Sequence, residues 1–80
     1  MMNELLSNLY LLHTTPLGRE RIRKNLQLTG EDPVAFCREL LSHPACHIFR
    51  QGKNWYGEKD RIRITVNAHS HTIITAHRTE

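Results

Sequence analysis

The sequence predicts a small α+β domain in which two to three N-terminal helices pack on a four-stranded antiparallel meander. Two observations carry this prediction. Apolar residues recur at helical spacing through the first half, whereas β-branched and aromatic residues alternate with polar ones in the second half. Turn residues divide that second half into four short segments, as is typical of strands joined by hairpins. We expect one domain over 1–80, with a helical part at 3–43 and a sheet part at 46–78.

Capping residues and prolines delimit the expected helices. Asn3 is an N-cap for a first helix that reaches about residue 13. A second helix begins at Pro16 and ends near residue 26, because proline suits the first helical position. Asp32 and a further proline begin a third helix, which ends before a His-Pro pair at 43–44. The expected core positions on these helices are Leu5, Leu9, Leu12, Ile22, Leu26, Val34, Cys37 and Leu41.

The expected strands cover residues 46–50, 54–56, 61–67 and 71–77. The register of the last hairpin has two alternatives: a two-residue turn pairs Val66 with Ile73, and a four-residue turn pairs Val66 with His71. Because strand side chains alternate between the two faces, both alternatives predict the same side chains on each face of the sheet. On the core-facing side we expect Ile62, Ile64, Val66, His71, Ile73, Thr75 and His77. On the face turned away from the helices we expect Arg61, Arg63, Thr65, Asn67, Thr72 and Arg78.

Composition narrows the classes of function. The net charge is +3 and the pI about 9.2, which permits a phosphate-bearing partner without requiring one. No apolar run approaches the roughly 20 residues that a membrane span needs, and the N-terminus lacks the basic region of a signal peptide. Two cysteines do not make a disulfide framework, so we expect reduced thiols and a cytoplasmic protein without membrane contact. The sequence does not indicate an oligomeric state.

We expect no cofactor and no metal. His69 and His71 on one strand face, with Cys46 and His47, supply the atoms that zinc uses, but none of the familiar paired spacings is present. The four glycines are too scattered to form a phosphate-cradling loop.

The segment 61–78 is the most informative part of the chain, because it is richer in arginine, threonine and histidine than a core requires. Arginine offers charge and forked donors to phosphate, and an exposed aromatic residue from the neighbouring strand, either Trp55 or Tyr56, can stack on a base. The alternative is that Trp55 belongs to the core and the arginines only solubilise the surface. The candidate binding residues are Arg19, Arg23, Lys53, Trp55, Arg61, Arg63, Thr65, Asn67, Thr72 and Arg78.

The sequence leaves open whether the protein is an enzyme. Ribonuclease chemistry needs a base for the ribose 2′-hydroxyl, an acid for the leaving oxygen and a cation for the phosphorane. His71 and His77 are the candidate catalytic residues on residue type, although a structural or surface role is the more common one for a histidine.

Three phrases carry a resemblance that covers nearly the whole chain: LHTTPLGRERIRKNL, RQGKNWYG and ITVNAHSHTIITAHR. Together they resemble an uncharacterised family of small proteins from Firmicutes, a domain of unknown function with no activity to carry over. In layout, the early arginines and the final Ile74–Arg78 phrase also resemble the superfamily of RNase toxins that includes barnase and RelE-type toxins. That resemblance implies helices followed by a curved antiparallel sheet and transfers no catalytic residue.

The function we expect is binding of RNA or a nucleoprotein through the C-terminal sheet, with ribonuclease activity as an option. The alternative, from another class, is a non-catalytic inhibitor or adaptor, such as a phage or mobile-element anti-defence protein of the anti-CRISPR type, that docks on a protein or nucleoprotein target. Small size and the lack of a clear catalytic motif suit that alternative.

Overall fold

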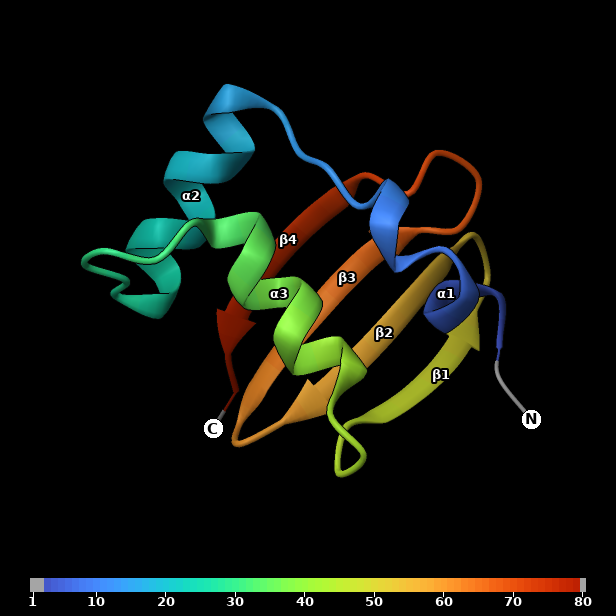
Figure 1. Cartoon of the computed structure of the whole chain (residues 1–80). Helices are drawn as coiled ribbons and strands as arrows, with labels where there is room; N and C mark the ends of the chain where they lie inside the picture. Colours follow the sequence, from blue (N-terminus) through green and yellow to red (C-terminus); the bar gives the residue numbers. More distant parts are fainter. Residues whose placement is uncertain (1–2, 80) are drawn as a thin grey trace.

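In the computed structural model, which describes residues 3–79, the helices lie on one face of a four-stranded sheet (Figure 1). The α+β arrangement predicted from the sequence is confirmed. The expected domain range of 1–80 also includes Met1, Met2 and Glu80, which lie outside the described residues. The elements are α1 (Glu4–Ser7), the 3₁₀ helix η1 (Leu9–Leu11), α2 (Pro16–Leu26), α3 (Pro33–Ser42), β1 (His47–Gln51), β2 (Asn54–Lys59), β3 (Ile62–Asn67) and β4 (Ile73–Arg78).

The first helix is shorter than predicted. The Oδ1 of Asn3 accepts a hydrogen bond from the Leu6 N–H at 2.8 Å, so the expected N-cap is present. The helix ends at Ser7, and a 3₁₀ turn replaces its second half. Asn8 accounts for the break, because its side chain donates to the Glu4 carbonyl at 2.8 Å while its own backbone leaves helical geometry. A short polar side chain that bonds nearby backbone competes with helix continuation.

Helices α2 and α3 begin at Pro16 and Pro33 and end at Leu26 and Ser42, as predicted. The Oγ1 of Thr15 accepts from the Gly18 N–H at 3.0 Å, and the left-handed backbone of Gln27, at φ 56°, ends α2. In α2, Ile22 and Leu26 are buried, as predicted. The basic side chains of this helix therefore lie on its outer sides.

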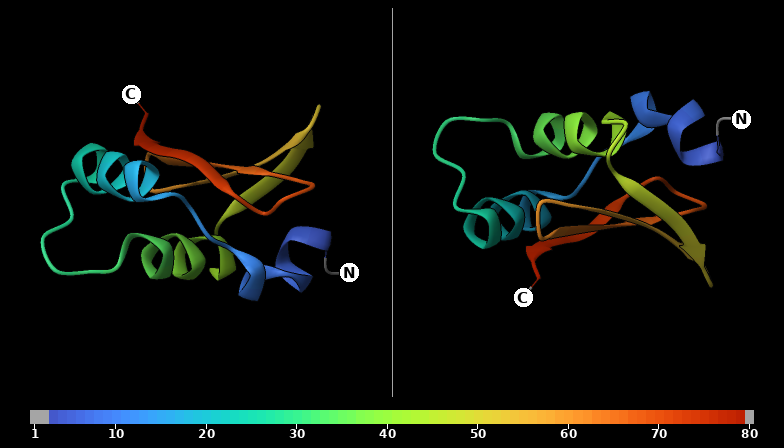
Figure 2. Two further views of the ribbon diagram at one scale, coloured as in Figure 1. Left: turned by 90° about the horizontal axis from the view of Figure 1, so that it is seen from above. Right: turned by 90° about the horizontal axis from the view of Figure 1, so that it is seen from below.

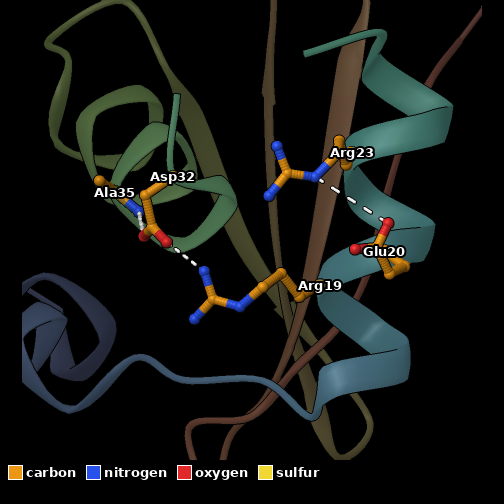
Figure 3. A network of polar contacts seen from close by, with 5 residues as sticks. All are labelled: Arg19, Glu20, Arg23, Asp32 and Ala35. Atoms are coloured by element: carbon orange, nitrogen blue, oxygen red, sulfur yellow. Dashed lines mark hydrogen bonds and ion pairs between the residues drawn. The ribbon is translucent and has the colours of Figure 1, made fainter. Parts of the chain in front are cut away.

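Asp32 joins the two helices, as Figure 3 shows. Its carboxylate accepts a hydrogen bond from the Ala35 N–H at 2.9 Å and forms an ion pair with Arg19 of α2. The bond from Ala35, and then the Arg19 side chain, hold the pKa of Asp32 below its usual 3.8. A lowered pKa contributes stability above that usual value, and the contribution is lost as the pH falls through the pKa of the folded state.

We expect Asp32→Ala to lower the free energy of unfolding at pH 7 by about 0.5–2 kcal/mol, because α3 loses its N-cap. Asp32→Asn keeps a capping oxygen and removes only the charge, so its loss should be smaller. Urea unfolding at pH 7 and pH 3 measures both effects. The gap between the wild type and Asp32→Asn should narrow at pH 3, and equal stability of Asp32→Ala and the wild type at pH 7 would contradict the capping role.

The sheet is an antiparallel meander in the order β1-β2-β3-β4, as predicted. The outer edge of β4 is bonded to the helical half: His13 exchanges backbone hydrogen bonds with His71 and Ile73, at 3.3 and 2.7 Å. The side chains of Thr14 and Asn25 donate to further β4 carbonyls at 3.0 and 3.2 Å. β1 forms the opposite edge of the sheet.

The register of the last hairpin begins with a predicted pair and is then shifted by one residue. Val66 pairs with Ile73, as the two-residue-turn alternative expects, but a β-bulge at Ile74 then moves every later pair by one residue. Because one extra residue reverses the faces of a strand, the predicted faces of β4 are wrong beyond Ile73. Thr75 and His77 lie on the side of Arg63, and Arg78 lies on the side of Ile62.

The core lies between the helices and the β3–β4 half of the sheet. Cys37 is wholly buried, as the prediction of a small buried hydrophobe expects, and burial raises the pKa of its thiol to about 12. The buried apolar residues are Leu5, Leu12, Ile22, Leu26, Val34, Cys37, Leu40, Leu41, Ile62, Ile64, Val66, Ile73 and Ala76. Within residues 3–79, no helix is long and apolar enough to cross a membrane.

Candidate nucleic-acid interface

The sheet face turned away from the helices, called the open face below, carries three cross-strand rows of side chains. Figure 2 shows the described helices all on the other side of the sheet. The end row is His47, Glu58, Arg63 and His77; the middle row is Phe49, Tyr56, Thr65 and Thr75; and the third row is Gln51, Asn54 and Asn67. The open face therefore combines aromatic, cationic and hydroxyl groups on adjacent strands.

An aromatic pair occupies the middle row. The rings of Phe49 and Tyr56 are stacked, with centroids 5.3 Å apart and planes inclined by 18°. The Arg63 guanidinium lies 5.9 Å from the centroid of the Tyr56 ring, and the His47 ring lies 5.3 Å from that of Phe49. Both rings of the pair are half-buried, so part of each remains accessible to a ligand.

Of the two aromatic residues that the sequence offered for stacking, Tyr56 lies on the open face and Trp55 on the helix side. Trp55 pairs with Val66, packs against the core and has the Arg50 guanidinium 5.6 Å from its ring centroid. Trp55 is thus a partly buried residue that packs against the core, which matches the alternative that assigned it to the core.

A hollow of about 520 Å³ opens beside the end row, where β2 turns into β3. The lining residues are His47, Glu58, Lys59, Arg61, Ile62, Arg63 and Thr79. Three of them are cations, which makes the hollow suitable for an anionic group such as phosphate.

Two of the cations in the hollow are paired with carboxylates. Arg63 bonds Glu58 through Nε, at 2.5 Å, and through its terminal nitrogen as well. Lys59 lies 2.5 Å from a carboxylate oxygen of Asp60, and that hydrogen bond lowers the pKa of Asp60. Arg61 forms no ion pair with any residue among 3–79. A phosphate in the hollow would meet Arg61 directly and compete with carboxylates for the other two cations.

Only some of the remaining predicted binding residues of the sheet lie accessible on the open face. Arg63 lies on the open face as predicted, whereas Arg61 lies in the β2–β3 turn, with a left-handed φ of 63°. Thr65 shares the face of Arg63 but is only 7% exposed, because Tyr56 and Thr75 flank it.

Arg78 and Lys53 lie away from the rows of the open face. Arg78 was expected on that face, but the bulge places it on the helix side, where it donates to the Leu26 carbonyl at 3.4 Å. Lys53 is exposed in the β1–β2 turn.

Asn67 and Thr72 bond the β3–β4 turn itself. The Oδ1 of Asn67 accepts from the backbone N–H groups of His69 and Ser70, both at 2.9 Å. The hydroxyl of Thr72 lies 2.8 Å from the Ser70 Oγ and 3.0 Å from the Nε2 of His13. Asn67 therefore stabilises the turn itself, and Thr72 joins the turn to His13 in the segment before α2.

The two arginines predicted on α2 lie on the helical side of the molecule. Arg19 pairs with Asp32, and the Nε of Arg23 lies 4.0 Å from a Glu20 carboxylate oxygen (Figure 3). Neither contributes to the open face.

His71 and His77 do not form a single catalytic site. His71 lies in the β3–β4 turn with a φ of 63°, and His77 lies near the far end of β4. Six residues of extended chain separate them by about 20 Å. His77 is on the open face beside Arg63, which corrects the predicted core-side position.

The candidate metal ligands are separated in the same way. His69 and His71 belong to the β3–β4 turn, whereas Cys46 and His47 lie at the other end of the sheet, where β1 begins. Among the described residues, no group of three or more histidine, cysteine or acidic side chains could hold a metal ion.

Several residues of the open face were not predicted as binding residues from the sequence. They include His47, Phe49 and Glu58. The expected three-residue turn at 51–53 would pair Phe49 with Trp55. In the structure Gly52, at φ 61°, forms a two-residue turn with Lys53. A glycine that provides a positive φ in a hairpin was the available signal.

Comparison with known proteins identifies one family. A family model described as "Protein of unknown function (DUF3781)" matches residues 6–77. No curated protein and no solved structure matches the chain.

Proposed function

This chain belongs to the DUF3781 family of proteins of unknown function, and we propose that it is a cytoplasmic protein that binds single-stranded RNA on the open face of its sheet. The observation that carries the proposal is the stacked Phe49–Tyr56 pair with Arg63 beside it. An accessible aromatic pair next to cations is the surface that single-stranded nucleic acids recognise, because every base has a face that can stack.

In this proposal the middle row binds a base and the end row binds a phosphate. A base stacks on the ring of Tyr56 or Phe49, and the phosphate beside it reaches Arg63 and the cations of the hollow. Stacking and phosphate contacts are both tolerant of sequence, so we expect weak base preference and strong dependence on salt. Loss of stacking on one ring costs about 1–3 kcal/mol per base.

Fluorescence anisotropy with a labelled 12-nucleotide RNA of mixed sequence, at 50 and 200 mM salt, tests the proposal. Tyr56→Ala should weaken binding about 5- to 100-fold, a change equivalent to one lost base stack. Tyr10→Ala is the matched control, because Tyr10 is 74% exposed in η1, outside the sheet. It should leave the affinity unchanged.

Arginine variants test the phosphate contacts in the same assay. Arg63→Gln should weaken binding and reduce the salt dependence, whereas Arg21→Gln, an exposed arginine of α2, should do neither. Equal affinities of Tyr56→Ala and Tyr10→Ala would contradict the proposed interface. Binding of a protein partner by the wild type, lost in Tyr56→Ala while RNA is not bound, would favour an adaptor or anti-defence role instead. An origin in Firmicutes and the layout resemblance to RNase toxins remain predictions.

A further inference from the structure

The end row of the open face places a carboxylate and an imidazole on either side of an arginine. The cross-strand pairs Glu58–Arg63 and Arg63–His77 put the three residues on consecutive strands of one face. We propose that this row cleaves RNA by transphosphorylation, with Glu58 as general base, His77 as general acid and Arg63 on the phosphate. The inference rests on the RNA binding proposed above.

The spacing of the row suits an in-line displacement. Glu58 and His77 are two strand spacings apart, about 10 Å. An attacking and a leaving oxygen on one phosphorus atom, with a hydrogen bond at each outer end, span about 10 Å as well. Side chains on one sheet face stand roughly parallel, so the two groups can reach the opposite ends of that axis while Arg63 meets the phosphate between them.

The contacts of Glu58 and His77 are also compatible with proton transfer. Arg63 bonds Glu58 through two nitrogens, so a phosphate that takes the guanidinium also frees the neighbouring carboxylate to accept a proton. The Nδ1 of His77 lies 3.2 Å from the Arg78 carbonyl oxygen. A protonated His77 can donate to that carbonyl through Nδ1 and present the Nε2 proton to a leaving group. Tyr56, two residues before Glu58 on the same strand face, is placed to stack the base of the nucleotide being cleaved.

The cleavage step requires only the RNA, these three side chains and water. Glu58 takes the proton of the ribose 2′-hydroxyl while the 2′-oxygen forms a bond to phosphorus. The bond from phosphorus to the 5′-oxygen breaks, and His77 gives its proton to that oxygen. The products are a 2′,3′-cyclic phosphate and a 5′-hydroxyl end. Arg63 stabilises the charge that develops on the non-bridging oxygens, with Arg61 and Lys59 of the hollow nearby. Exchange with water restores the two protonation states.

Mass spectrometry of the labelled RNA after incubation with the pure protein at 50 mM salt tests the proposal. The expected products carry 2′,3′-cyclic phosphate ends. Glu58→Gln and His77→Ala should each slow cleavage by about 10²- to 10⁴-fold, the usual contribution of a general acid or base. Both should bind the RNA within about threefold of wild type, because stacking remains.

Two control variants and a control substrate accompany the test. Glu39→Gln on α3 and His69→Ala in the β3–β4 turn replace exposed side chains of the same types and should cleave at the wild-type rate. The DNA version of the probe lacks the 2′-hydroxyl and should remain intact. RNA that is bound by the wild type but stays uncut would overturn the cleavage inference alone, as would undiminished cleavage by His77→Ala. Absence of RNA binding would overturn the proposed function as well.

Discussion

Replacing Ile64 by alanine is expected to lower the free energy of unfolding by about 2–5 kcal/mol, because the deletion leaves a cavity in the centre of the core. Ile64 is wholly buried on β3, a central strand, and pairs with Gly57 and Ala76. Neither neighbour in the sheet has a large side chain that could fill the space. In a domain this small, such a loss is a large share of the total stability.

Urea unfolding followed by circular dichroism measures this effect. Ile74→Ala is the matched control, because Ile74 is 44% exposed at the bulge of β4. This substitution removes the same atoms as Ile64→Ala, but from the surface. We expect its change to stay within about 0.5 kcal/mol. Ile64→Val should fall between the two, at about 0.5–1.5 kcal/mol. An Ile64→Ala protein as stable as Ile74→Ala would show that β3 is not the centre of the core.

Replacing Gly57 by alanine is expected to cost about 1–3 kcal/mol of stability through overpacking. Gly57 is buried on the helix side of β2, and a Cβ there would lie 2.2 Å from the Cδ2 of Leu41 and 3.3 Å from the Cys46 sulfur. Leu41 is 1% exposed, so its side chain has little room to move away. The glycine therefore allows α3 to approach the sheet, and Tyr56 and Glu58 on either side of it face outward.

Gly30→Ala is the control for this prediction, because a Cβ at Gly30 would meet nothing within 4 Å. The double variant Gly57→Ala with Leu41→Ala separates overpacking from other effects. If the clash is the cause, the two changes together should cost less than the sum of each alone. Strict additivity of the two changes would contradict the packing account.

The interface proposed for RNA could be predicted from the sequence only in part. Tyr56 and Arg63 were among the expected residues because an aromatic residue and a basic alternating strand are visible in the chain itself. Phe49 was missed because it reaches the interface through a cross-strand register, which depends on a turn that differs by one residue from the one expected. Glu58 was missed because the expected strand ended at residue 56, whereas β2 continues to Lys59. His77 was expected as a catalytic candidate, but its neighbours Arg63 and Glu58 follow from pairing alone.

The bulge at Ile74 shows why alternation was insufficient at the end of the chain. Ile73, Ile74 and Thr75 are all β-branched, so the local pattern does not mark which of them is the extra residue. In the structure, His13 and Thr14 bond the backbone at residues 71 and 73 from outside the sheet, next to the bulge. A contact between residues about 60 positions apart in the chain has no local sequence signal.

The sequence by itself determined that helices precede a four-stranded meander, the bounds of α2 and α3, and most of the buried positions. These features depend on local capping, proline geometry and hydrophobic period, which are properties of short segments. Only the tertiary structure decided which side chains share the open face and that His71 and His77 are far apart. A one-residue change in a turn or strand moves every later side chain to the other face, and contacts distant in the chain select that register.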